Sequence, residues 1–265
     1  MTVGVYEDQF DSRHDFSHNR RATKTLIIAS TVRSGSHMLG HALHATGAFG
    51  YPLEYAQPKN LSVWKQKLGV NTTPQAMEKL LARRSSENGV FGIKVHYRHL
   101  DTLGGLSGLL QCFPDPHFVL LTRDDIMAQA VSLAIARQTG NWISGQNESD
   151  VEPEYCFSDI DDSLRRVILA NASWQYLLAA NGLPTLPLRF SDVKNNTRQT
   201  ITDIAGFMDV ELDESRIPST PVTKKQSKSL NQSWIARFQK EAGQGDELLR
   251  YHTEKLTYRL KRKFR

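Results

Sequence analysis

Four short, mostly apolar runs recur along the chain and are bounded by polar or turn-forming residues. They are Thr25–Ser30, Val90–Tyr97, His117–Thr122 and Thr185–Phe190. A strand that is apolar on both sides is typical of a parallel sheet that is covered on both faces. Thr25–Ser30, which is apolar without alternation, is therefore predicted to be a buried parallel strand, and the other three runs are predicted to be further strands.

Between these runs, apolar residues recur at helical spacing. Helix start and stop signals place the helices at about residues 37–46, 73–85, 125–138, 158–180 and 197–208. The inner face of the helix at 158–180 is predicted to carry Ile160, Leu164, Ile168, Asn171 and Leu178. Strands that alternate with helices indicate an α/β fold with a central, mostly parallel sheet flanked by helices.

The chain has 265 residues and contains neither an internal repeat nor a low-complexity tract. That length is enough to bury one large core. We expect a single domain over residues 1–265, with an N-terminal arm at 1–23 and a basic C-terminal helix at 245–265. Two long loops, Asn141–Phe157 and Glu214–Gln232, are candidates for functional segments, because long loops in compact domains often carry function.

The composition narrows the class of protein only slightly. A net charge of +5 favours anionic partners such as nucleotides, nucleic acid or a membrane surface. The two cysteines, Cys112 and Cys156, lie far apart and in no metal-ligand spacing, which favours a reducing compartment. Met1–Lys24 lacks the apolar segment of a secretory signal, and no window approaches the ~18 apolar residues of a membrane span. We therefore expect a cytoplasmic protein, whose basic tail either touches an anionic membrane surface or is a solvated helix end.

The turn after the first predicted strand has the composition of an anion-binding loop. It reads Thr31-Val32-Arg33-Ser34-Gly35-Ser36 and leads into a predicted helix. A helix N-terminus offers unpaired backbone N–H groups, and Gly35 lets the backbone approach a ligand closely. Hydroxyl donors and the guanidinium of Arg33 add to this cradle. The loop lacks the Walker A pattern, which argues against a kinase or GTPase, and a polar turn without a ligand is the alternative.

Several segments together resemble a known family. Arg33-Ser34-Gly35-Ser36 looks like the 5′-phosphosulfate loop of sulfotransferases, and within that superfamily it is similar to the bacterial trehalose 2-sulfotransferase family. Gly50–Tyr55 resembles that family's Gly-x-Pro-x-Glu-Phe segment, with Tyr55 in place of the Phe. Arg123–Ser132 fits its Arg-x-Asp-x3-Gln-Ala-Val-Ser pattern without a gap. Near the end of the chain, the family's Gln-x7-Trp-x2-Arg-aromatic spacing is kept by Gln226, Trp234, Arg237 and Phe238.

The resemblance implies a P-loop-like sulfotransferase fold. It also implies transfer of the sulfuryl group of 3′-phosphoadenosine-5′-phosphosulfate (PAPS), a co-substrate, to a hydroxyl of a carbohydrate or glycolipid acceptor such as a trehalose-like sugar. No metal is expected, and no nucleic acid, since zinc-finger, RRM and helix-turn-helix signatures are absent from the sequence. A homodimer is left open. The alternative function is that of a non-catalytic nucleotide- or anion-binding α/β protein.

The resemblance also assigns residues to the donor. Arg33, Ser34, Gly35, Ser36 and His37 would hold the 5′-phosphosulfate. The 3′-phosphate would be held by Arg123, at the end of a strand, and Ser132, in the helix that follows, and Gln226 completes the donor-binding set. The alternative is that Arg123 pairs with Asp124 or Asp125 and that Ser132 is ordinary helix surface.

Two residues are candidates for the chemistry itself. Glu54 aligns with the carboxylate that the resemblance implies is the base, and such a base needs a pKa raised from ~4.3 by partial burial. A solvated loop glutamate is the alternative. Lys94 aligns with a lysine of the family and must find a partner, either a sulfonate or Glu54, because an unpaired buried charge is costly. A lysine that reaches solvent from the strand end is equally compatible with the sequence.

The first predicted helix carries three histidines. His37 stands where the family has Thr, so its imidazole could contact the 5′-phosphosulfate or act as an alternative base. With His41 and His44 it has i, i+4, i+7 spacing, but the His-Glu-x2-His context of a zinc site is missing, so we expect no metal there. Trp142 is a candidate for the acceptor site or for a loop anchor.

Overall fold

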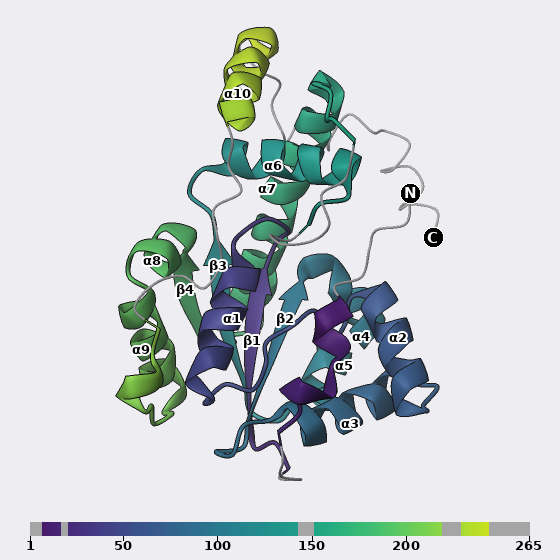
Figure 1. Cartoon of the computed structure of the whole chain (residues 1–265), viewed down its shortest axis with the longest axis vertical. Helices are drawn as coiled ribbons and strands as arrows, with labels where there is room; N and C mark the ends of the chain where they lie inside the picture. Colours follow the sequence, from purple (N-terminus) through teal and green to yellow (C-terminus); the bar gives the residue numbers. More distant parts are fainter. Residues whose placement is uncertain (1–6, 17–20, 143–150, 219–228, 244–265) are drawn as a thin grey trace.

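Residues 7–16, 21–142, 151–218 and 229–243 are described in the computed structural model, where they form helices around one sheet (Figure 1). The sheet has four parallel strands in the order β2-β1-β3-β4. Their bounds are β1 Lys24–Ser30, β2 Val90–His96, β3 Pro116–Thr122 and β4 Thr185–Arg189. The four predicted strands and the α/β class with its parallel sheet are thus confirmed, with strand ends shifted by one residue at most.

Alternate residues of the strands enter two different hydrophobic clusters. In β1, Leu26 and Ile28 pack into one cluster, while Ile27 and Ala29 pack into the other. Both sets of side chains have to be apolar, which is why the run shows no alternation in the sequence. Lys94 of β2 pairs in register with Ile28, so it lies on the face that carries the cluster of Leu26 and Ile28.

Helices cover both faces of this sheet (Figure 1). The first face holds α1 (Ser36–Thr46), α8 (Phe190–Asn195) and α9 (Thr197–Met208). The other face is covered by α2 (Pro58–Leu68), α3 (Thr73–Arg84), α4 (Leu100–Leu103), α5 (Gly105–Cys112) and part of α7 (Phe157–Ala180). The short helices α2, α4, α5 and α8 were not predicted from the sequence.

A third hydrophobic cluster joins helices beyond the carboxyl ends of the strands. It packs α6 (Ile126–Thr139), the first half of α7 and α10 (Ser229–Ala242) against one another. Helix α10 starts inside the segment predicted as the loop Glu214–Gln232, and η4 (Glu214–Arg216) lies at the start of that segment. Trp234 and Phe238, from the family pattern, are buried in this cluster and serve packing.

The inward face of α7 differs from the predicted one. Its buried residues are Ile160, Ser163, Val167, Trp174 and Leu178. Trp174 fixes this rotation, because its buried indole Nε1–H donates to the Ser30 carbonyl at the end of β1, at 3.0 Å. Leu164, Ile168 and Asn171 are only half-buried as a result.

The described part of the N-terminal arm is docked on the body of the protein. It forms η1 (Glu7–Phe10) and η2 (Ser12–His14). Arg84, fully buried at the end of α3, donates to the carbonyls of Gln9 and Asp11 and forms an ion pair with Asp15 at 2.7 Å. The single-domain organisation stays a prediction, and the predicted helix at 245–265 lies outside the described residues.

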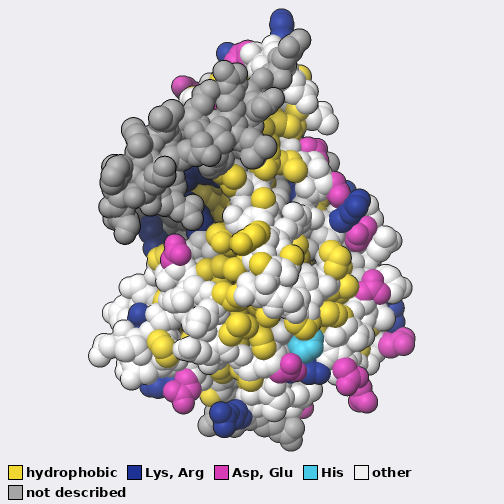
Figure 2. All heavy atoms as spheres, turned by 180° about the vertical axis from the view of Figure 1, so that it is seen from behind, with side chains coloured by type: hydrophobic (Ala, Val, Ile, Leu, Met, Phe, Trp, Pro, Cys, Tyr) yellow, Lys and Arg dark blue, Asp and Glu magenta, His cyan; other side chains and the backbone are white. Residues whose placement is uncertain are grey.

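Figure 2 shows that the opposite face of the molecule carries a band of hydrophobic side chains flanked by charged ones. Of the large hydrophobic side chains that are exposed among the described residues, Leu110 belongs to α5 and Tyr176 to α7. The described helices include none that is long and apolar enough to cross a membrane. A homodimer stays a prediction, for which such a band offers an apolar surface.

Candidate active site

The loop between β1 and α1 has the backbone geometry of an anion cradle. Arg33 and Gly35 both have positive φ angles, of 61° and 89°. A Cβ atom on Gly35 would lie 2.2 Å from the ring of Phe190, so no other residue fits there without a shift. Gly35 is also the N-cap of α1 and has no side chain to occupy the first amides of the helix. These amides therefore remain available to an anionic ligand.

Ser34 supplies the second feature of the cradle. Its side chain is fully buried, and its hydroxyl makes no hydrogen bond to any described residue. Buried hydroxyls normally have a partner, so an orphaned one beside a helix N-terminus indicates a group that a ligand satisfies. Ser36 begins α1 and is buried next to it.

Side chains of helices α6 and α7 hold this loop in place by hydrogen bonds. The buried amide of Gln129 donates to the Thr31 hydroxyl at 2.9 Å and to the Val32 carbonyl at 2.7 Å. The Thr31 hydroxyl in turn donates to Asn171 of α7 at 3.3 Å. The sequence showed Gln129 only as one letter of a family pattern, and the structure shows that its side chain fixes the cradle.

Two guanidinium groups lie beside the loop. Arg33 Nε donates to the Ser132 hydroxyl at 2.9 Å, and Arg33 Nη1 donates to the Trp142 carbonyl. Arg123 donates to the Arg33 carbonyl at 3.3 Å, and its guanidinium carbon lies 5.2 Å from the centre of the Phe190 ring. Burial and the charge of Arg123 lower the pKa of Arg33 to about 10. Two cations held this close indicate a site for an anion.

The neighbouring carboxylates have other partners. Asp124 accepts a hydrogen bond from Ser191 at 2.9 Å and lies 3.5 Å from Arg189. Asp125 caps α6 by accepting from the Ala128 amide at 2.8 Å. Within the described part of the chain, no carboxylate lies within ion-pair distance of Arg123. Arg123 therefore forms no ion pair with Asp124 or Asp125 in this structure, although the charge of Asp125 acts against the lowering of its pKa by burial.

Glu54 and Lys94 meet at the edge of the sheet. The segment before Glu54 runs parallel to β2, where Leu53 bridges Ile93 and accepts a hydrogen bond from the Lys94 amide at 2.9 Å. Lys94 Nζ lies 2.8 Å from Glu54 Oε1, and the lysine side chain is only 4% exposed. Lys94 therefore does not reach solvent, and Glu54 is the partner that it finds.

The charge state of Glu54 differs from the one expected for a base. Burial raises the pKa of Glu54, but the charge of Lys94, the imidazoles of His96 and His99 and the Lys94 hydrogen bond together hold it well below its usual range. The sequence-based requirement of a raised pKa is thus not met in the ligand-free protein. A carboxylate in this state accepts hydrogen bonds well and protons poorly.

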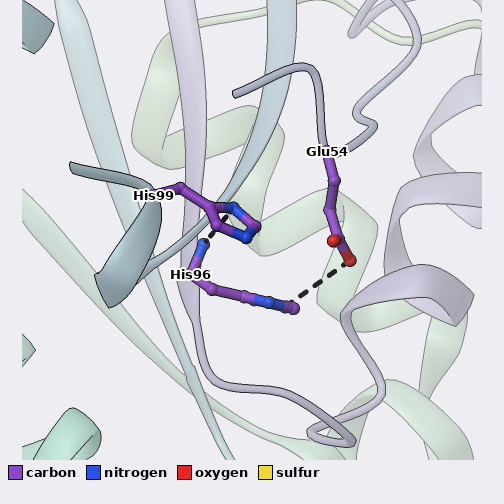
Figure 3. Close-up of side chains that lie close together, drawn as sticks. All are labelled: Glu54, His96 and His99. Carbon is purple, nitrogen blue, oxygen red and sulfur yellow. Dashed lines mark hydrogen bonds and ion pairs between the residues drawn. The ribbon is translucent and has the colours of Figure 1, made fainter. Parts of the chain in front are cut away.

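Two histidines that sequence reasoning missed complete this cluster (Figure 3). His96 lies two residues after Lys94 on β2, and its ring extends toward the carboxylate, with Nε2 at 3.7 Å from Glu54 Oε1. His99 Nδ1 accepts the backbone N–H of His96 at 3.3 Å. A signal was present in the sequence, since Lys94 and His96 are the polar residues of an apolar strand and share one face.

One ligand atom from each of Glu54, His96 and His99 lies within 4.8 Å of the others, which is close enough for a shared metal ion. These residues fit a metal poorly for two reasons. Lys94 already holds the carboxylate. His99 Nδ1 accepts the His96 N–H, so the ring lone pair that a metal would need is already used, and the other ring nitrogen carries the proton.

His37 lies in the first turn of α1, and its contacts and its pKa argue against the role of base. Its Nε2 is 2.8 Å from His41 Nε2, and His41 Nδ1 is 3.4 Å from the Tyr51 hydroxyl. Burial, Lys94 and His41 lower the pKa of His37 to about 2. His44 stacks on Tyr51 at 3.9 Å, so the three histidines do not converge on one point. Gln226 lies outside the described residues.

Fold and site together define an α/β protein with a glycine-containing loop after β1, two arginines and an acid–lysine pair at the carboxyl ends of parallel strands, where such sheets bind their ligands. A family model described as Stf0 sulphotransferase matches residues 25–241. The chain belongs to this family and is an enzyme of the sulfotransferase class.

Two curated proteins and one solved structure are similar to this chain. The chain is 23% identical over 264 residues to the trehalose 2-sulfotransferase of Mycobacterium tuberculosis strain Erdman, covering 84% of this chain and 97% of the relative. It is 23% identical over 260 residues to that of Mycolicibacterium smegmatis, covering 83% and 96%. The sulfotransferase domain of the Synechococcus PCC 7002 olefin synthase aligns in structure with a TM-score of 0.44 and 16% identity, covering 83% of this chain and 89% of that one.

Proposed function

We propose that this sulfotransferase transfers the sulfuryl group of PAPS to a hydroxyl of a small carbohydrate or glycolipid acceptor. The observation that carries the proposal is the cradle, in which the open N-terminus of α1, the orphaned Ser34 hydroxyl and two guanidinium groups gather in one place. Backbone amides, a hydroxyl and guanidinium groups all donate hydrogen bonds to anionic oxygens, and together they suit a ligand with separate phosphate and phosphosulfate ends. The names of the two curated relatives favour a trehalose-like sugar as acceptor.

The residues divide between the two ends of the donor. The 5′-phosphosulfate would be held by Ser34, Gly35, Ser36 and the first amides of α1, with His37 beside them. The 3′-phosphate would be held by Arg123 and Ser132. Arg33 would connect the two sets of residues, because its Nε bonds Ser132 while its backbone belongs to the loop. Gln226 remains a proposed donor contact from the sequence. No metal ligand is required, since the cations near the sulfonate are side chains.

Lys94 and Glu54 would then act in sequence. PAPS supplies an activated sulfuryl group whose bond to the 5′-phosphate oxygen breaks during transfer. A sulfonate near Lys94 competes with Glu54 for that cation, and the loss of the cation as a partner raises the pKa of the carboxylate. Glu54 can then accept the hydrogen bond, and the proton, of the acceptor hydroxyl. In this proposal the ion pair seen here is a resting state.

A ligand panel tests the donor. We expect 3′-phosphoadenosine-5′-phosphate (PAP) to raise the melting temperature, because a ligand at 100 times its Kd adds about 2.7 kcal/mol to the free energy of unfolding. ATP and an oligonucleotide should leave the temperature unchanged. Stabilisation by ATP but not by PAP would contradict the proposal.

A transfer assay then tests the acceptor. Labelled sulfuryl groups from PAPS should appear on a sugar such as trehalose in a panel of mono- and disaccharides and glycolipids, with EDTA present. PAP binding without transfer to any acceptor would favour the second candidate, a nucleotide-binding protein without chemistry.

A further inference from the structure

Glu54 and His96 are arranged one behind the other. The Glu54 side chain is 25% exposed and the His96 side chain 10% exposed. An acceptor hydroxyl that approaches the cluster therefore meets the carboxylate first. His96 lies on the strand behind it, and Figure 3 shows its ring reaching toward the carboxylate.

The contact between these two groups is unusual for a buried imidazole. His96 Nε2 is enclosed, makes no hydrogen bond to any described residue, and faces Glu54 Oε1 at 3.7 Å. That distance exceeds the 2.7–3.2 Å of an N–H···O hydrogen bond. A buried polar atom without a hydrogen bond destabilises the folded protein, and a role in the reaction would explain why this one is kept. A proton delivered to this pair would close the contact into a charge-assisted hydrogen bond.

The surroundings set which group keeps such a proton. Lys94 bonds the carboxylate, and His99 accepts the His96 amide through Nδ1, so its neutral ring has no free acceptor for a further proton. Burial and Lys94 lower the pKa of His96, while Glu54 raises it, so its imidazole is neutral around pH 7. His37, on α1, shares the surroundings of Lys94 and Glu54 and is neutral too. His96 thus presents to Glu54 an enclosed ring nitrogen that makes no hydrogen bond to a described residue and lies 3.7 Å from Oε1.

We propose that His96 is the final proton acceptor of the transfer reaction and that Glu54 passes the acceptor's proton to it. The inference rests on the proposed function. As the acceptor oxygen forms its bond to sulfur, the bond from sulfur to the 5′-phosphate oxygen breaks and PAP leaves with that electron pair. The hydroxyl proton moves to Glu54 and then to His96 Nε2, which leaves a carboxylate beside an imidazolium. His96 returns the proton to water when the products have left.

The test compares His96→Gln with His117→Gln, the same substitution on β3 at the opposite, amino end of the sheet. We expect kcat of His96→Gln to fall by about 10²-fold, the lower end for loss of a general base. PAP affinity should stay at the wild-type value. The acid limb in the pH dependence of kcat should move or disappear in His96→Gln and stay in place in His117→Gln. Added imidazole should restore part of the rate to His96→Gly.

Different results separate this inference from the proposed function. Wild-type kcat and an unchanged acid limb in His96→Gln, with normal transfer from PAPS by the wild type, would overturn the role of His96 alone. If the wild type shows neither PAP binding nor transfer, the proposed function fails and the role of His96 falls with it.

A second measurement does not depend on activity or on the variant's turnover. In the wild-type protein with labelled histidine, the nitrogen spectrum should show His96 Nε2 without a proton at neutral pH. Its titration should move to lower pH in Glu54→Gln, because that change removes the neighbouring negative charge. A protonated Nε2 at neutral pH, or a titration unaffected by Glu54→Gln, would overturn the proposal.

Discussion

At the scale of single residues, the guanidinium of Arg123 is placed by contacts that a lysine cannot copy. Its Nη1 donates to the Arg33 carbonyl, and its guanidinium carbon lies 5.2 Å from the centre of the Phe190 ring. We expect Arg123→Lys to weaken PAP binding by about 10-fold, because a point charge loses the planar fork and the contact with the aromatic ring. Binding of 5′-AMP, which lacks the 3′-phosphate, should change much less.

Arg189→Lys is the matched control, since Arg189 also ends a strand but is 71% exposed and paired with Asp124. Titration calorimetry of both variants with PAP and 5′-AMP gives the comparison. An equal preference for the 3′-phosphate in Arg123→Lys and wild type would remove Arg123 from the site.

Glu54 is the second residue whose role can be measured directly. Glu54→Gln keeps the shape and can still accept the Lys94 hydrogen bond, but it cannot take a proton at neutral pH. Turnover should fall by roughly 10²–10⁴-fold with PAP affinity near the wild-type value. His37→Ala should cost little, because a pKa of about 2 makes that imidazole a poor proton acceptor. The opposite ranking of the two variants, at saturating acceptor, would transfer the role of base to His37.

At the scale of elements, the βα turn depends on Gly35. Its φ of 89° and the contact with Phe190 leave no room for a side chain. Gly35→Ala should lower the free energy of unfolding by about 1–3 kcal/mol and weaken PAP binding further, since the displaced Phe190 ring supports Arg123.

Gly206→Ala is the control for this change. Gly206 lies in α9 at ordinary backbone angles, and no atom lies within 4 Å of the added Cβ. Alanine should stabilise the helix there by about 0.5–1 kcal/mol. Urea unfolding without PAP measures the change in the free energy of unfolding, and unfolding with PAP measures the change in PAP binding. A Gly35→Ala variant that binds PAP normally would contradict the proposed role of the cradle in donor binding.

At the scale of the whole molecule, the histidine-rich interior couples stability to pH. Burial lowers the pKa of six histidines: His14, His37, His41, His44, His96 and His99. The unfolded chain takes up protons near pH 6.5 while the folded protein does not, so stability is full above that pH and falls below it. Each histidine contributes up to about 1.4 kcal/mol per pH unit between pH 6.5 and its folded pKa.

The midpoint of urea unfolding should therefore drop steeply from pH 7 to pH 5, before the carboxylates are protonated. Replacing both His37 and His41 by Phe should flatten this drop, because their folded pKa values are lowered to about 2 and about 4. A midpoint that is constant from pH 7 to pH 5 would contradict the burial of these rings in their neutral form.

Much of this protein follows from local pattern. The four strands could be predicted because burial on both faces demands runs such as Leu26–Ala29, and the cradle because Gly35 and its neighbours have a backbone requirement that shows in the residue type. The short helices α4, α5 and α8 were not predicted, because few turns give no clear helical period. The inward face of α7 was predicted wrongly, because the hydrogen bond from Trp174 to β1 decides how the helix is rotated about its axis.

The amino-acid sequence by itself thus determined the α/β sheet, the glycine-containing turn after β1 and the position of Arg123 at a strand end. Only the tertiary structure decided that Lys94 bonds Glu54, that His96 stands behind this pair, and that Asp124 turns to Arg189. The physical reason is the distance along the chain over which each effect acts. Backbone propensity and burial act on each residue and its neighbours in sequence, whereas charge pairs and proton affinities depend on distances between segments that the fold alone brings together.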